Sequence, residues 1–282
     1  MLSRNWLILF ALLPAGAFAW GDDCKVRAER AGGIDINGVE KVVIRAGAGD
    51  LKVQGDSSAT RIEARGEACA NKQELLDAAQ ITVRREGNVV YVETKLPQSE
   101  GNSFWGNDDY AYIDLEISLP SRLPVDGTDS SGDAVFEDLQ SLQVQDSSGD
   151  LKLARIPGAV DVTDSSGDLT IRDVGSVRVR DSSGDMQIDH VRSDVTVQMD
   201  SSGDMRISKV DGNVRVEQDS SGGIHIEDVK GSVKVDSDSS GDIYAGHVGG
   251  DFTVSEDSSG SIGHSAIAGR ISVPSNKEDD VE

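Results

Sequence analysis

The stretch that decides the fold is Asp219-Ser-Ser-Gly-Gly-Ile-His-Ile-Glu-Asp-Val-Lys-Gly-Ser-Val-Lys-Val-Asp-Ser, which is followed at once by Asp238-Ser-Ser-Gly-Asp242. Between the two copies of Asp-Ser-Ser-Gly, apolar and polar residues alternate, and most of the apolar ones are β-branched. This alternation predicts half-buried β-strands, and Asp-Ser-Ser-Gly predicts the turn that joins them. Each unit can hold two or three short strands with their turns.

The Asp-Ser-Ser-Gly segment recurs at intervals of 17 to 19 residues. A unit of this length is too short for a strand-helix-strand crossover, and it is about half the length of a propeller blade. One unit cannot bury its own apolar side, whereas units stacked end to end build a continuous core. The sequence therefore predicts an all-β chain that forms a single parallel β-solenoid, right-handed by the crossover preference. The eight copies begin at Asp129, Asp146, Asp164, Asp181, Asp200, Asp219, Asp238 and Asp257.

Each residue of the repeated turn has a structural explanation. The Gly allows a positive φ or a close approach of the neighbouring coil, and stacked Ser hydroxyls can bond along the rod. Counting the alternation from Val214 and Val216 predicts that the first Ser of each copy faces the core. The two Asp residues should then form exposed rows with about 4.8 Å between carboxylates, where two charges repel by about 0.9 kcal/mol in water.

Calcium is an alternative role for these carboxylates, because Ca²⁺ takes six to eight oxygen ligands. The chain lacks the Gly-Gly-x-Gly-x-Asp pattern of calcium-binding β-rolls, so calcium is permitted but not required, and no other cofactor is expected. The second Asp is replaced by Gly223 and Ser261 in two copies. The candidate ligands are the pairs in which both carboxylates are present: Asp129, Asp133, Asp146, Asp150, Asp164, Asp168, Asp181, Asp185, Asp200, Asp204, Asp238 and Asp242.

The remaining segments indicate an exported chain. Residues 1–19 have a basic start, a short apolar run and Ala-Phe-Ala at the end, as a cleaved signal peptide does. Residues 20–122 are expected to form irregular first coils that cap the solenoid, and residues 123–274 its regular repeats. Residues 275–282 read as an acidic tail. No later stretch is apolar enough to span a membrane, so we expect a periplasmic or surface location.

The net charge limits the classes of partner, and the two cysteines indicate a disulfide. The net charge of -23 excludes ordinary nucleic-acid binding and argues against an anionic membrane surface. Cys24 and Cys69 are expected to pair in an oxidising compartment.

Four aromatic residues fall in the polar loop 98–112, namely Phe104, Trp105, Tyr110 and Tyr112. They could contact a protein or glycan partner, or they could form a flap that buries its rings against the solenoid. Both interpretations remain open at this point.

No catalytic pattern emerges, and we predict that the chain is not an enzyme. Carboxylates are so abundant that any pair could be nominated as acid and base, and aromatic residues are too few for a sugar cleft. The histidines lie at different offsets within their units, so we expect them to occupy different rows and form no multi-histidine metal site. They are His190, His225, His247 and His264.

The run Asp114-Leu-Glu-Ile-Ser-Leu-Pro120, then Leu123-Pro-Val125 and the repeated Ser-Ser-Gly-Asp, resembles the putative-adhesin β-strand-repeat proteins of bacterial envelopes over about residues 35–273. The resemblance implies a β-solenoid and an envelope context, and it brings no catalytic residues. Our leading hypothesis is a non-catalytic envelope scaffold or adhesin-like protein that binds another envelope component. The alternatives are a Ca²⁺-dependent adhesion or stability module and, less favoured, a polysaccharide-active β-helix enzyme.

Overall fold

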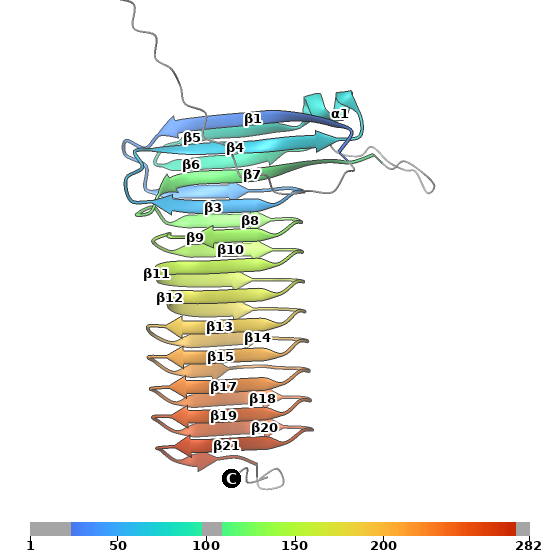
Figure 1. Cartoon of the computed structure of the whole chain (residues 1–282). Coiled ribbons are helices and arrows are strands. Elements are labelled where there is room, and N and C mark those ends of the chain that lie inside the picture. The colour runs from blue at the N-terminus through green and yellow to red at the C-terminus, as the bar shows by residue number, and fades with distance from the viewer. Residues whose placement is uncertain (1–23, 98–108, 275–282) are drawn as a thin grey trace, which may run out of the picture.

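The computed structural model describes residues 24–97 and 109–274. The predicted signal peptide, most of the aromatic loop and the acidic tail lie outside these residues. The described chain forms a rod of stacked coils with a broader cap at its N-terminal end (Figure 1). Each coil is a pair of short strands joined by turns, and the coils repeat about every 17 to 19 residues, as the repeat predicts.

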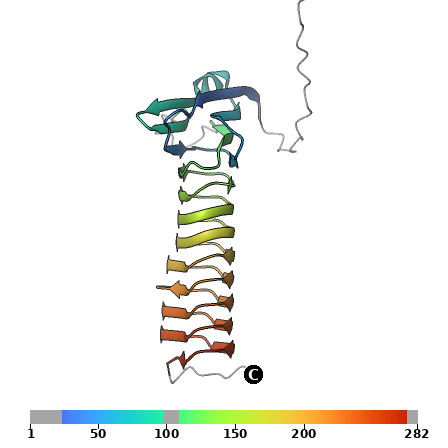
Figure 2. The same ribbon diagram turned by 90° about the vertical axis from the view of Figure 1, so that its left-hand side faces the viewer.

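Two sheets run the length of the rod, one on each side (Figure 2). From the cap downwards, the first sheet contains β5 (Gln80–Glu86), β6 (Val89–Lys95), β2 (Lys41–Arg45), β8 (Val125–Asp129), β10 (Leu142–Asp146), the second halves of β11 (Leu151–Thr163) and β12 (Leu169–Arg180), β14 (Val195–Met199), β16 (Val214–Val216), β18 (Val233–Asp238), β20 (Phe252–Asp257) and β22 (Ile271–Ser272).

The second sheet contains β1 (Val26–Asp35), β4 (Arg61–Ala70), β7 (Ala111–Pro120), β3 (Leu51–Asp56), β9 (Ala134–Glu137), the first halves of β11 and β12, β13 (Met186–Val191), β15 (Met205–Val210), β17 (Ile224–Val229), β19 (Ile243–Val248) and β21 (Ile262–Ile267). Pairing is parallel in every coil. It is antiparallel only in the cap, between β5 and β6 and along β1, β4 and β7.

The cap lies over the N-terminal end of the core. It includes α1 (Gln73–Ala78) and the Cys24–Cys69 disulfide that the sequence predicted. Within residues 24–97 and 109–274, no helix is long and apolar enough to cross a membrane. The Gly49-Asp50 pair belongs to the first coil, below the antiparallel strands, where Ala48 pairs with Ser131 of the next coil.

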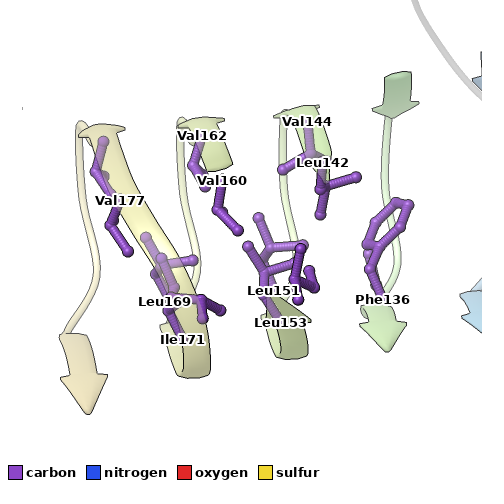
Figure 3. Close-up of a cluster of buried hydrophobic side chains, with 14 of the residues drawn as sticks. Phe136, Leu142, Val144, Leu151, Leu153, Val160, Val162, Leu169, Ile171 and Val177 are labelled. Atoms are coloured by element: carbon purple, nitrogen blue, oxygen red, sulfur yellow. The ribbon is translucent and has the colours of Figure 1, made fainter. Parts of the chain in front are cut away.

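The core is a narrow apolar layer between the two sheets. Side chains such as Val160 and Val162 of the first sheet point toward Leu151 and Leu153 of the second (Figure 3). These four residues are all about 1% exposed or less. Each coil contributes the same small set of inward positions, so the core continues from one coil to the next without a break.

One inward position differs from our prediction. In β10, Leu142, Val144 and Asp146 alternate toward the inside, so the first Asp of the repeat, and not the first Ser, faces the core. The 19-residue coils carry one extra residue before this Asp, because the register shifts after Val179. Our count started from a 19-residue coil and therefore reached the wrong parity.

Candidate functional site

The first Asp of the repeat forms a buried row along the inside of one corner. These carboxylates are 0 to 3% exposed, which contradicts the expectation of an exposed row. At Asp146 and Asp181 one oxygen accepts the backbone N–H of the following Ser, at 2.8 and 2.7 Å, whereas the other oxygen has no hydrogen-bond partner. The row comprises Asp129, Asp146, Asp164, Asp181, Asp200, Asp219 and Asp238.

Burial of these carboxyl groups favours their neutral form. Desolvation, followed by repulsion from neighbouring carboxylates, raises the pKa of Asp164 and Asp219 to about 7. Desolvation first, and then the charge of Asp200, raises the pKa of Asp181 to about 6. Ionisation of one inner carboxyl group therefore disfavours ionisation of its neighbours in the row.

The second Asp of the repeat has a different task. Its Oδ1 atom accepts the backbone N–H of the equivalent residue in the next coil, as Asp133 does from Asp150 at 3.0 Å and Asp185 from Asp204 at 3.0 Å. Gly223 and Ser261 keep this backbone donor although they lack the carboxylate. The outer row is therefore a ladder of bonds between coils, and the substitutions in two copies remove one acceptor each.

The Ser and Gly residues complete the corner as the sequence predicted. The hydroxyl of the second Ser donates to the carbonyl of the first Ser in the preceding coil, as Ser166 does to Ser147 at 3.2 Å. Gly184 has a φ of 129°, and a Cβ there would lie 1.8 Å from the carbonyl oxygen of Gly167. The second Ser, the Gly and the second Asp of the segment are consequently explained by the stacking of coils, whereas the first Asp is, in most copies, buried without a contact of this kind.

This geometry bears on calcium. Among the described residues, no group of three or more His, Cys, Asp or Glu side chains is arranged to hold a metal ion. The outer carboxylates accept backbone N–H groups, and the inner ones are buried with raised pKa values.

We therefore expect the midpoint of thermal unfolding to be the same in calcium chloride and in chelator, when both are measured at equal ionic strength. Magnesium at the same concentration is the control for general screening of the acidic surface. A midpoint that rises with calcium and falls with chelator, but does not respond to magnesium, would contradict this and restore the calcium hypothesis.

The aromatic loop is only partly described. Phe104 and Trp105 lie outside the described residues. Tyr110 and Tyr112 lie at the start of β7 with ring centroids 6.4 Å apart, and both are partly buried. Burial, and then the charge of Asp114, raises the pKa of Tyr112. Tyr112 pairs with Cys69 of β4, and the position of these two residues leaves both interpretations of the loop open.

The opposite corner of the coils carries a feature that the sequence analysis missed. All non-glycine residues with positive φ in the described parts of the chain lie there, one per coil, at φ values of 50 to 58°. Left-handed conformations are uncommon outside glycine and cost about 1–3 kcal/mol each. Seven of the eight side chains carry an ionisable group. The row comprises Asp138, Arg155, Asp173, His190, Lys209, Asp228, His247 and Ala266.

A groove of about 720 Å³ runs along this edge. One wall comes from the left-handed row, and the other from the residues two positions later in each coil. The floor includes Val191 and Val229, which belong to the core. The groove is lined by Asp173, His190, Val191, Arg192, Lys209, Asp211, Asp228, Val229, Lys230, His247 and Gly249.

The groove mixes both signs of charge. Lys230 lies 2.7 Å from Asp211, and Lys209 lies 3.2 Å from Asp189. Its three fixed cations, Arg192, Lys209 and Lys230, equal in number its three aspartates, in a chain whose net charge is -23. This edge is thus less acidic than the chain as a whole. The side chains of Lys209, Lys230 and His247 are more than half exposed.

Two histidines occupy equivalent positions in this row, contrary to our expectation. His190 and His247 both have left-handed backbones, and Lys209 and Asp228 lie between them. Their offsets within the units differ because of the extra residue in the 19-residue coils. Aligning the units on the second-sheet strand, instead of on the first, would have placed both in one row and revealed that its members are never glycine.

Comparison with models of protein families agrees with this architecture. The family model described as Toastrack DUF4097 matches residues 79–267. The solved structures include the "Putative lipid binding protein" of Parabacteroides distasonis (14% identity, 90% of this chain and 97% of that chain, TM-score 0.42). They also include a "putative adhesin" of Bacteroides fragilis (14% identity, 89% and 98%, TM-score 0.36). No curated protein matches the chain.

Proposed function

Because the chain belongs to the Toastrack DUF4097 family, we propose that it is a non-catalytic binding scaffold of the bacterial cell envelope. The binding surface in this proposal is the left-handed edge, which consists of the row of eight left-handed residues and the groove beside it. The row of left-handed, non-glycine residues carries this proposal. Glycine would relieve the backbone at each of these eight positions, yet all eight keep a side chain. Strain retained at many equivalent positions suggests that the side chains themselves are needed.

The disulfide and the N-terminal residues support a location in the cell envelope. The disulfide between Cys24 and Cys69 suits an oxidising compartment, and residues 1–19 have the pattern of a signal peptide. We place the protein in the periplasm or on the cell surface. Its partner is an envelope component, protein or glycan, that presents polar groups of both signs to the groove.

Substitution by glycine along the edge separates binding from folding. In a variant with His190→Gly, Lys209→Gly, Asp228→Gly and His247→Gly, relief of the left-handed backbone offsets the greater chain entropy of glycine, so we expect an unfolding midpoint close to that of the parent. The groove loses one wall, and binding to the envelope fraction that retains the parent protein should fall at least tenfold. Binding is measured by co-sedimentation with separated envelope fractions.

The control changes exposed cations on a sheet face instead of the edge. Arg215→Ser and Lys234→Ser lie on neighbouring strands of the first sheet and remove two of its positive charges. This control should bind as the parent does. Retained binding by the glycine variant, or equal loss in both, would refute the edge as the binding site.

A further inference from the structure

The N-terminal end of the rod is less well covered than its middle. In the coils, inward side chains are almost fully buried, as Val197 and Ile207 are. At the cap, several apolar side chains contact the core and remain partly exposed. They are Val26, Ala28 and Ile34 of β1, Leu75 of α1, and Ile81 and Val83 of β5. This layer has a core beneath it and no complete layer of described residues above it.

Strand β1 is also the edge of the second sheet at this end (Figure 1). Among the described residues it pairs only with β4, through all ten of its residues. A long edge strand presents unpaired backbone N–H and C=O groups, which is the geometry for pairing with another strand. The partly covered apolar layer and the open edge therefore lie at the same place.

We propose that two copies of this chain associate through antiparallel pairing of their β1 edges, centred on Ala31. A twofold axis perpendicular to the sheet pairs each residue with one of the same parity, so the inner faces of the two strands remain on the same side. In this register Ala28 lies opposite Ile34 of the partner subunit on the inner side. On the outer side Arg27 lies opposite Asp35 of the partner subunit, and this pair occurs twice.

The charges of β1 favour this register over its two neighbours. Centring on Arg30 would place that guanidinium opposite its own copy. Centring on Gly32 would place Glu29 opposite Asp35 of the partner subunit, again twice. Like charges directly opposite are destabilising, and opposite charges stabilise a cross-strand pair. Of these three registers, only the one centred on Ala31 has two opposite-charge pairs and no like-charge pair.

Other side chains near the edge are compatible with this pairing. Arg27 contacts Glu67 of β4 at 3.3 Å, so it lies on the outer face. The Arg30 side chain is held by the carbonyls of Ala79 and Leu76, each at 2.8 Å, which keeps it within its own subunit. The two rods would then meet cap to cap, with their C-terminal ends pointing outward.

The first test exchanges the charges of the proposed cross-strand pair. It uses the chain without residues 1–19, and sedimentation equilibrium measures the mass of the particle in solution as a function of concentration. The parent should dimerise. Arg27→Asp and Asp35→Arg should each weaken the dimer about tenfold, because each creates two like-charge pairs. The double variant should recover it, and an equimolar mixture of the single variants should form a mixed dimer. Arg65→Asp, on the outer face of β4 opposite Ala31, is the matched control and should dimerise as the parent does.

The second test locates the axis. Ala31→Cys places two thiols opposite each other at the twofold axis, where a disulfide between subunits should form under mild oxidation. Glu29→Cys puts the equivalent thiols about 13 Å apart and should not cross-link. A parent that stays monomeric at all concentrations, a dimer that is indifferent to the charge reversals, or equal cross-linking at both positions would overturn the proposal. Binding at the left-handed edge does not depend on this outcome.

Discussion

Replacing Gly203 by Ala is expected to destabilise the rod by more than about 4 kcal/mol. A Cβ at this position would lie 1.9 Å from the carbonyl oxygen of Gly184 in the preceding coil, and the backbone there has a φ of 130°. The chain cannot yield easily, because the Gly203 and Gly184 amides donate to carbonyls of the adjoining coils, at 3.3 and 3.1 Å. The loss is measured as the shift of the unfolding midpoint in denaturant.

Gly87→Ala is the matched control for this substitution. Gly87 also has a positive φ, of 62°, yet a Cβ there would have no heavy atom within 4 Å. Its replacement should cost only the left-handed backbone term of about 1–2 kcal/mol. If both variants lost the same stability, conformational preference would explain the corner glycines, and contact between coils would not.

Acidification is expected to stabilise the rod, contrary to the usual behaviour of acidic proteins. The inner carboxyl groups have a pKa raised by desolvation, to about 7 at Asp219 and about 6 at Asp181, from an ordinary value of 3.8. The folded state therefore binds more protons than the unfolded state between about pH 4 and pH 7. Their contribution is fully present below about pH 4 and is lost as the pH rises to about 7.

A single substitution isolates this effect from the general repulsion of a chain with net charge -23. Asp181→Asn keeps the shape and the acceptor oxygen while it removes the charge. One pKa unit corresponds to 1.36 kcal/mol, so a shift of about two units predicts that the variant gains up to about 3 kcal/mol over the parent at pH 8. The gain should vanish at pH 4, where the parent carboxyl is neutral. Because neighbouring carboxyl groups titrate together, several substitutions should give less than the sum of single ones.

Asp185→Asn is the control, since this outer carboxylate is exposed and accepts a backbone N–H from Asp204. It should not reproduce the pH-dependent gain. Unfolding in denaturant at pH 4, 6 and 8 measures all three proteins. A parent that is more stable at pH 8 than at pH 4, or an Asp181→Asn variant that gains nothing at pH 8, would show that the inner row is charged in the folded state.

How far the sequence alone predicts this molecule depends on which strand is used to align the coils. The spacing of Asp-Ser-Ser-Gly predicted the stacked coils, and turn chemistry predicted the glycine contacts and the serine ladder. The inward position of the first Asp was not predicted, because one extra residue in the longer coils changes the parity of the alternation after Val197. No local pattern announces such an extra residue, because it is defined by pairing with a strand 17 to 19 residues away.

The candidate site was not predicted from the sequence for a related reason. At the left-handed edge the residues share a backbone conformation and not a residue type, so Lys209 and Asp228 do not look equivalent in the sequence. The cap is also set by pairing between distant segments, such as Val26 with Ala70, which alternation within each strand does not specify. Local periodicity therefore reveals the repeated part of the chain, whereas both the left-handed edge and the cap arise from contacts between segments.

The ladder of bonds between coils has a consequence for the length of the molecule. Where both carboxylates are present, each coil offers to the next the same hydroxyl donors, carboxylate acceptors and glycine contacts that it receives from the one before, as Ser166 and Asp185 do. Coils that follow this pattern can become neighbours without new chemistry at the corner. Gain or loss of one such coil by gene duplication or deletion changes the rod by about 4.8 Å and keeps this ladder of bonds. Selection can therefore set the length of the rod in steps of one coil.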